Sequence, residues 1–135
     1  MTEQGEQQGI AAAIVVHDRK VLMVRRRVAE GELVWQFPAG AMEAGESAEQ
    51  TAEREAFEET GLSVDAMMSL GEREHPVTGR QMAYVVCAVI TGEAHVADPD
   101  ELAAVAWVSH AELADYVPSG LFEPVQEYLD QHLAV

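Results

Sequence analysis

Basic residues are scarce in this sequence: its 135 residues include 8 Lys and Arg against 24 Asp and Glu, a formal charge of −16 at pH 7. Proteins that bind nucleic acids or anionic membranes present clustered basic side chains, and the one basic run here is 25–27. We therefore expect neither nucleic acid nor a membrane as partner. A small anionic ligand is still compatible with the sequence, because metal ions and a few arginines can offset a negative field locally.

Other missing features narrow the class of protein further. Cys87 is the single cysteine, so no internal disulfide can form, and its apolar neighbours indicate a buried strand. No apolar run is long enough to cross a membrane, and the first eight residues are polar and acidic, unlike a signal peptide. No linker or repeat divides the chain. We expect frayed residues at 1–9 and one domain over 10–135, in a cytoplasmic monomer or homodimer.

Apolar segments and turn residues predict strands that alternate with helices. Residues 18–20 fit a hairpin turn, 28–33 a loop and 94–102 an acidic loop. The segment 81–90 is apolar on both faces, which favours a sheet covered on both sides. Together these signals predict an α/β sandwich. Its strands are expected at 10–17, 21–27, 34–37, 64–74, 81–90 and 103–108, and its helices at 48–60, 110–114 after a cap at Ser109, and 121–133.

The helix at 48–60 has recognisable start and stop signals. Ser47 and Gln50 fit a capping box at its beginning, in which each side chain bonds the other residue's backbone N–H. Gly61 fits the left-handed position just beyond its end.

Three carboxylates share one face of that helix. Glu55, Glu58 and Glu59 stand at i, i+3 and i+4, so their side chains lie within about one turn of each other. Like charges repel, and a divalent cation relieves this repulsion; such hard oxygen ligands suit Mg²⁺ or Mn²⁺. A solvated acidic helix face is the alternative interpretation. The glycine-rich loop before the helix and Arg54 beside the cluster favour metal binding.

Residues 40–62 resemble the Nudix box, G-x5-E-x7-R-E-U-x-E-E-x-G-U, in which U is a bulky apolar residue. Every fixed letter is present, and only Ala56 is small for its position. The resemblance extends over nearly the whole chain and implies the Nudix fold, an α/β/α sandwich with a mixed β-sheet between helices. The fixed letters are Gly40, Glu46, Arg54, Glu55, Glu58, Glu59 and Gly61.

The resemblance implies a magnesium-dependent pyrophosphohydrolase, with manganese as the alternative metal. Its substrate would be a nucleoside diphosphate linked to another moiety, as a nucleoside triphosphate or a nucleotide conjugate, and water would attack phosphorus. An ADP-ribose or nucleotide-sugar pyrophosphatase is one alternative. Two alternatives from other classes are a non-catalytic nucleotide-sensing domain and an acidic interaction domain.

Positions in the box imply roles for its residues. Glu55, Glu58 and Glu59 would bind the metal, with the backbone carbonyl of Ala39 as a further ligand. Arg54 would hold neighbouring carboxylates in place, although an ordinary helix ion pair is the alternative.

One further acidic residue is expected at the site from outside the box. Glu101 lies in the acidic loop, where MutT-like members carry a glutamate that binds a second metal or takes the proton from water. Asp98 and Asp100 are competitors for this role, as is plain solvation of the loop.

Substrate contacts are expected from three residues. Arg25 is at a position where family members often contact phosphate, with Arg26 or Arg27 as substitutes. Tyr84 would stack on a base, with core packing as the alternative. Phe122 stands where MutT-like members read guanine with an asparagine, and Ala41 stands where they carry a lysine. Selection by stacking and size is therefore expected.

Overall fold

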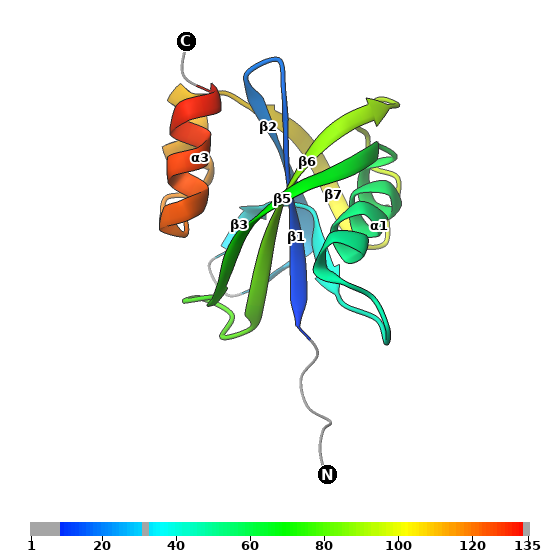
Figure 1. The fold of residues 1–135 in the computed structure, drawn as a ribbon. Helices are drawn as coiled ribbons and strands as arrows, with labels where there is room; N and C mark the ends of the chain where they lie inside the picture. Colours follow the sequence, from blue (N-terminus) through cyan, green and yellow to red (C-terminus); the bar gives the residue numbers. More distant parts are fainter. Residues whose placement is uncertain (1–8, 31–32, 134–135) are drawn as a thin grey trace.

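The computed structural model describes residues 9–30 and 33–133, which form a seven-stranded sheet with helices on its two faces (Figure 1). The helix α1 lies on one side of the sheet and α3 on the other, which confirms the predicted sandwich. The strands are β1 (Ile10–His17), β2 (Lys20–Glu30), β3 (Leu33–Gln36), β4 (Ala39–Ala41), β5 (Ser63–Glu74), β6 (Gln81–Thr91) and β7 (Leu102–Val108). The helices are α1 (Ala48–Thr60), the 3₁₀ turn η2 (His110–Glu112), α2 (Leu113–Tyr116) and α3 (Glu123–Leu133).

Strand β1 joins the two halves of the sheet. It pairs in parallel with β6, while its other edge pairs antiparallel with β4 at its start and with β2 at its end. The sheet is therefore mixed, as expected from the family resemblance.

The core has two layers because β1 alternates between the faces of the sheet. Ala12 and Ile14 pack in the layer that includes α3, whereas Ala13 and Val15 pack in the layer that includes α1. All four side chains are at most 1% exposed. Cys87 is buried in the α1 layer, and burial raises the pKa of its thiol to about 12. The prediction of a sheet covered on both sides is confirmed.

Several local expectations are confirmed and others are wrong. Asp18 and Arg19 both have positive φ, at 53° and 62°, which makes the expected tight hairpin between β1 and β2. The predicted loop at 28–33 is wrong over 28–30 and at Leu33, because β2 continues to Glu30 and pairs there with Leu33, the first residue of β3. The glycine-rich segment before α1 was expected to be a loop, but residues 39–41 form β4 on β1.

The last helix begins two residues later than the predicted range of 121–133. The carbonyl of Phe122 accepts the first helical bond, from Gln126 N at 2.9 Å, and Pro124 occupies the first turn, where its missing N–H has no consequence. The segment after β7 begins as a 3₁₀ turn and continues through Tyr116 rather than ending at residue 114.

Two further expectations concern the start of the chain and the lack of a membrane-spanning segment. The prediction of a frayed start covers residues 1–9, of which residues 1–8 lie outside the described part. Among the described residues, no helix is both long and apolar enough to span a bilayer.

Candidate active site

The caps of α1 fix the register of its acidic face. Gln50 N donates to Ser47 Oγ and Ser47 N donates to Gln50 Oε1, both at 3.0 Å, so the predicted capping box is confirmed. Gly61 ends the helix with φ of 78°. Ala52 and Ala56 are fully buried against the sheet. The small side chain of Ala56 thus lies at the helix–sheet contact, and the carboxylates of the box lie on another face.

Glu59 is the most buried carboxylate of the cluster. Its exposure is only 4%, and its Oε1 is buried without a hydrogen-bond partner in the part of the chain that the structure describes. Its Oε2 lies 3.6 Å from Arg26 Nη1. Burial raises the pKa of Glu59 to about 8, the neighbouring Glu55 adds to this shift, and Arg26 opposes it. A buried oxygen without a partner is costly, so this position favours binding of a cation.

Glu55 lies against the backbone of the preceding strand. A Cβ at position 40 would collide with the Glu55 carboxylate, so Gly40 is required for this close approach. The side chain of Glu55 is 13% exposed, and burial raises its pKa while Arg54 opposes the shift. Glu58 lies at the outer edge of the cluster with 53% of its side chain exposed.

Arg54 connects the carboxylates of the box. Its Nε and Nη2 donate to the two oxygens of Glu46 at 2.6 and 2.9 Å, and Nη2 also donates to the carbonyl of Ala41 at 3.0 Å. Its Nη1 lies 3.0 Å from Glu55 Oε2 and 3.2 Å from Glu58 Oε1. A guanidinium with donors on three nitrogens can hold several carboxylates at once. These contacts support the positioning role implied by the family pattern.

The acidic loop before β7 is tied to α1 at its start. His95 N donates to the carbonyl of Thr60 and Ala97 N to that of Glu59, both at 3.0 Å. These bonds satisfy carbonyls that the helix end leaves without partners. A Cβ at Gly61 would collide with the His95 ring, so this glycine serves both the helix end and the loop.

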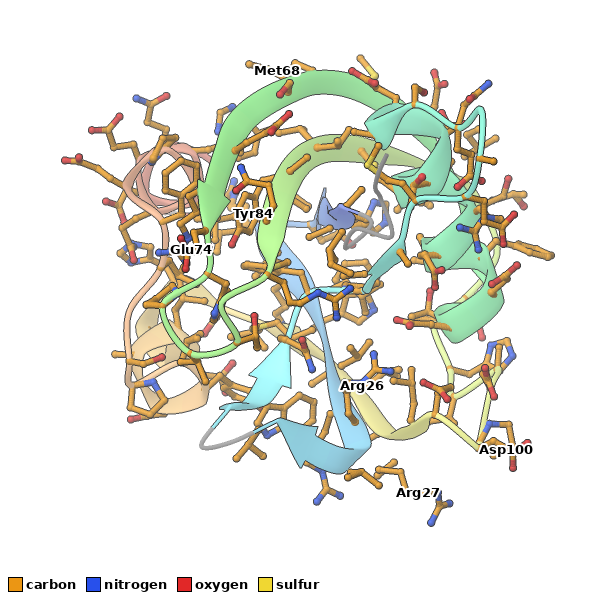
Figure 2. All side chains as sticks on the ribbon, turned by 90° about the horizontal axis from the view of Figure 1, so that it is seen from below. Arg26, Arg27, Met68, Glu74, Tyr84 and Asp100 are labelled. Atoms are coloured by element: carbon orange, nitrogen blue, oxygen red, sulfur yellow. The ribbon has the colours of Figure 1, made fainter. Side chains whose placement is uncertain are left out.

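The far end of the loop is tied to β2. Arg27 N donates to the carbonyl of Glu101 and Arg27 Nε to that of Pro99, both at 2.8 Å. The side chain of Glu101 contacts the guanidinium of Arg26, which also faces Glu59. Figure 2 shows Arg26 on the inner side of β2 and Arg27 on its outer side, with Asp100 at the outer edge of the loop. Glu101 is therefore brought to the cluster, through Arg26.

The donor atoms fit a divalent cation, although the side chains point elsewhere in this structure. Over the described residues, no three acidic, histidine or cysteine side chains converge closely enough to enclose an ion. Glu59 is turned toward Arg26, whereas Glu55 and Glu58 are turned toward Arg54. Hard carboxylate oxygens on one helix face and the unpartnered Oε1 of Glu59 are nevertheless suitable ligands for Mg²⁺ or Mn²⁺.

Of the three substrate residues named from sequence, Tyr84 and Phe122 lie together, whereas Arg25 contacts neither of them. Arg25 is exposed on β2, and its guanidinium carbon is 5.9 Å from the centre of the Trp35 ring. Tyr84 is only 2% exposed and packs on Phe122, with ring centres 5.3 Å apart. Arg73 covers both rings, at 5.8 and 5.2 Å from their centres. Of the alternatives for Tyr84, these contacts favour core packing.

Sequence reasoning missed two cationic contributions to the site. Arg26 was named only as a substitute for Arg25, yet it contacts Glu59 and Glu101. Arg80, in the connection between β5 and β6, was not named, yet it lines a cleft together with Arg26 and Gly40. The scarcity of basic residues in the sequence could have pointed to these two arginines, because few other side chains of this acidic chain can offset negative charge at the site.

The chain belongs to the Nudix hydrolase family, since it matches the NUDIX domain over residues 7–129. It is 31% identical over 106 residues to a protein of Bacillus subtilis provisionally named 8-oxo-dGTP diphosphatase, a match that covers 78% of this chain and 68% of that protein. It is 44% identical over 61 residues to the RNA pyrophosphohydrolase of Sodalis glossinidius, covering 45% of this chain and 33% of that protein.

The structural comparison agrees with the fold. A NUDIX hydrolase from Nitrosomonas europaea superposes with a TM-score of 0.78 and 22% identity, covering 96% of this chain and 73% of that chain. The chain spans about a quarter to two thirds of the length of the curated relatives that it matches.

Proposed function

We propose that this chain is a divalent-metal-dependent pyrophosphohydrolase. Its substrate is a nucleoside diphosphate linked to another moiety, as in a nucleoside triphosphate or a nucleotide conjugate, and water attacks phosphorus. The proposal rests on the position of Glu59, whose buried Oε1 has no partner among the described residues although it lies among the carboxylates of an intact Nudix box. A domain that serves only as an acidic surface has no need for such a buried, unpartnered oxygen.

The metal site in this proposal consists of carboxylates from α1 and one backbone group from β4. Glu55, Glu58 and Glu59 would hold the ion together with the carbonyl of Ala39, and Glu101 would join them from the acidic loop. A divalent ion there supplies positive charge for the diphosphate and makes water a better nucleophile at neutral pH. Mg²⁺ is our first choice and Mn²⁺ the alternative, because both prefer oxygen ligands.

The remaining steps are assigned to the protein's own side chains. Arg54 holds Glu55 and Glu58 in position, while Gly40 leaves room for Glu55. Arg26 lies between Glu59 and Glu101 and is placed to contact the diphosphate. Glu101 either binds a second metal or accepts the proton from the attacking water, at the carboxylate oxygen that does not contact Arg26. Arg25 stays a prediction for phosphate contact, and the position of Arg26 beside Glu59 and Glu101 favours Arg26 for this role.

The substrate and setting of the enzyme are also proposals. The 8-oxo-dGTP diphosphatase name of one relative and the RNA pyrophosphohydrolase name of another both indicate phosphoanhydride hydrolysis on nucleotides. ADP-ribose and nucleotide sugars remain alternative substrates. We propose one domain over 10–135 and a cytoplasmic location, with a monomer or homodimer as the assembly; the acidic composition supports a small nucleotide rather than nucleic acid as partner.

A substrate panel tests the proposal. Nucleoside triphosphates, dinucleoside polyphosphates, nucleotide sugars and ADP-ribose would be assayed with Mg²⁺ and coupled phosphate release, next to the Glu59→Gln variant. We expect turnover of at least one class by the wild type and its loss in the variant. Calorimetry with Mg²⁺ and the same nucleotides distinguishes the enzyme from a non-catalytic nucleotide-sensing domain. Such a domain is expected to bind a nucleotide without cleaving it.

A further inference from the structure

A cleft beside the Nudix box contains two arginines. Its walls include Arg26 from β2, Gln36 from β3, Ala39 and Gly40 from β4, and Thr78 and Arg80 from the connection between β5 and β6. Glu55 lies against Gly40, and Arg26 faces Glu59. The cleft therefore adjoins the carboxylate cluster along one side, and Arg80 enters it from the β5–β6 connection.

Arg80 has a fixed backbone and no partner for its Nε. The backbone N–H of Arg80 donates to Thr78 Oγ1 at 3.2 Å, and the backbone carbonyl of Arg80 accepts from His75 N at 2.8 Å. The Nε atom is buried, and over the described residues it has no hydrogen-bond partner. Because a buried donor of a charged group is costly without an acceptor, this nitrogen favours an anionic ligand.

Arg80 has a buried guanidinium nitrogen but no carboxylate counter-ion among the described residues. Arg19, Arg25, Arg27 and Arg73 likewise have none there, so the burial of its Nε is what distinguishes Arg80. Arg54 and Arg26 both contact carboxylates. Of the residues lining the cleft, Arg26 and Arg80 carry the positive charges, and Ala41 offers none.

We propose that Arg80 binds a third phosphate that adjoins the scissile diphosphate, and that it thereby favours nucleoside triphosphates over conjugates whose extra moiety is uncharged. This inference rests on the proposed function, because the cluster must hold the diphosphate for the next group to reach the cleft. A guanidinium suits this task, since its fork matches the oxygens of phosphate. Arg80 is thus a specificity-determining residue.

The test compares Arg80→Gln with the wild type on substrate pairs that share a base. These pairs are ATP with ADP-ribose and UTP with UDP-glucose. In the variant, kcat/KM for the triphosphates should fall about 10- to 100-fold, as expected for loss of a charge-assisted hydrogen bond. For ADP-ribose and UDP-glucose it should change less than about threefold. An equal fall for both members of each pair, or no fall for either, overturns the inference.

Two further variants keep the result interpretable. Arg19→Gln makes the same change in charge at the exposed β1–β2 turn and should leave both substrate classes unaffected. Arg80→Lys retains the charge but not the fork, so it should keep more of the triphosphate preference than Arg80→Gln. Thermal melting of each variant identifies unfolding. If Arg80→Gln does not fold, Arg80→Lys decides the question. A preference of Arg80→Lys for triphosphates equal to that of the wild type then counts against the inference.

A binding experiment distinguishes failure of the inference from failure of the proposed function. Calorimetry would measure the affinities of a non-hydrolysable ATP analogue and of ADP, with Mg²⁺, for the wild type and Arg80→Gln. We expect the wild type to prefer the triphosphate and the variant to lose about 10-fold or more of that preference. If no nucleotide is cleaved but this difference persists, the role of Arg80 stands and the proposed hydrolysis falls. If nucleotides are cleaved and the difference is absent, only the role of Arg80 falls.

Discussion

Arg54 forms a bidentate contact with Glu46, in which Nε and Nη2 donate to the two carboxylate oxygens at 2.6 and 2.9 Å. This pair joins the loop before α1 to the middle of the helix. Thr51 Oγ1 adds a third hydrogen bond to Glu46, at 2.7 Å. The remaining nitrogen of Arg54 faces Glu55 and Glu58, so the pair sets the position from which Arg54 reaches the metal-binding side chains.

The Glu46–Arg54 pair predicts a specific loss of stability in acid. The hydrogen bonds from Arg54, aided by those from Glu43 N and Thr51, lower the pKa of Glu46 from 4.5 to about 2. A lowered carboxyl pKa contributes stability that is complete above pH 4.5 and disappears as the pH falls toward 2. Glu46→Gln should therefore have a lower Tm than the wild type at neutral pH, with a gap that narrows below pH 4.5.

Thermal melts followed by circular dichroism between pH 2 and 7 measure this gap. Glu49→Gln is the matched control, because it removes an exposed carboxylate from the first turn of the same helix. Its Tm difference from the wild type should be smaller at neutral pH. A Glu46→Gln gap that stays constant down to pH 2 would contradict the assigned contribution of the pair.

The second prediction concerns the metal-binding carboxylates. Glu58→Gln and Glu59→Gln keep the shape of the side chain and remove the charge that a metal requires. Each should leave less than about a tenth of wild-type turnover, since loss of a metal-assisted nucleophile is costly in the transition state. Coupled phosphate release measures turnover, and circular dichroism should show an intact helix content.

Metal binding provides a readout that is independent of turnover. Mg²⁺ should raise the Tm of the wild type, because a ligand that binds the folded state stabilises it, and should raise that of Glu59→Gln much less. Glu49→Gln again serves as the control. If both cluster variants kept more than about a tenth of the turnover, the assignment of the metal site would be wrong.

The third prediction concerns Glu101, which contacts Arg26 from the acidic loop. If it binds metal or accepts the proton, Glu101→Gln should lower kcat about 100-fold or more while KM stays within a few-fold, because the contact matters mainly in the transition state. Steady-state kinetics on the best substrate measure both constants. Glu93→Gln is the control, because it removes an exposed carboxylate from the segment before β7 that has no assigned role. A normal kcat in Glu101→Gln would move the role to Asp98, Asp100 or a glutamate of the box.

The parts of the site that local signals determine could be predicted from sequence. The bounds of α1 follow from a capping box and a left-handed glycine, and both act within a few residues of the helix ends. The common face of Glu55 and Glu59 then follows from the helical repeat. The alternation of β1 residues between the two core layers is equally local, since successive strand residues face opposite sides of the sheet.

The parts that depend on pairing between distant segments could not be predicted. Strand β4 is an Ala-Gly-Ala segment with no β-strand preference of its own, and it is extended because it pairs with β1. The register of β2 against β7 shifts between Arg25 and Arg26, so simple counting along the strand does not show which arginine faces the box. Arg80 lines the cleft that Arg26 and Gly40 also line, although it comes from the connection between β5 and β6, which is distant from both in the sequence.

The last prediction concerns the base of the substrate. Phe122 packs on Tyr84 beneath Arg73, in an apolar cavity that also includes Trp35. A phenylalanine has no amide with which to read the edge of guanine, and an apolar wall distinguishes related bases only weakly. If the base lies near this cavity, selection depends on stacking and size. The enzyme should then prefer 8-oxo-dGTP over dGTP by less than about 100-fold.

Measurement of kcat/KM for both guanine nucleotides decides this prediction. Phe122→Asn supplies the missing amide at the same position, and it should raise the preference for the oxidised nucleotide, because a site that hydrogen-bonds a base edge rejects analogues that lack the matching group. Phe122→Leu is the control, since it changes the apolar wall without adding a polar group. A preference of about 1000-fold or more in the wild type would contradict selection by stacking, because such a ratio requires hydrogen-bond readout by another residue.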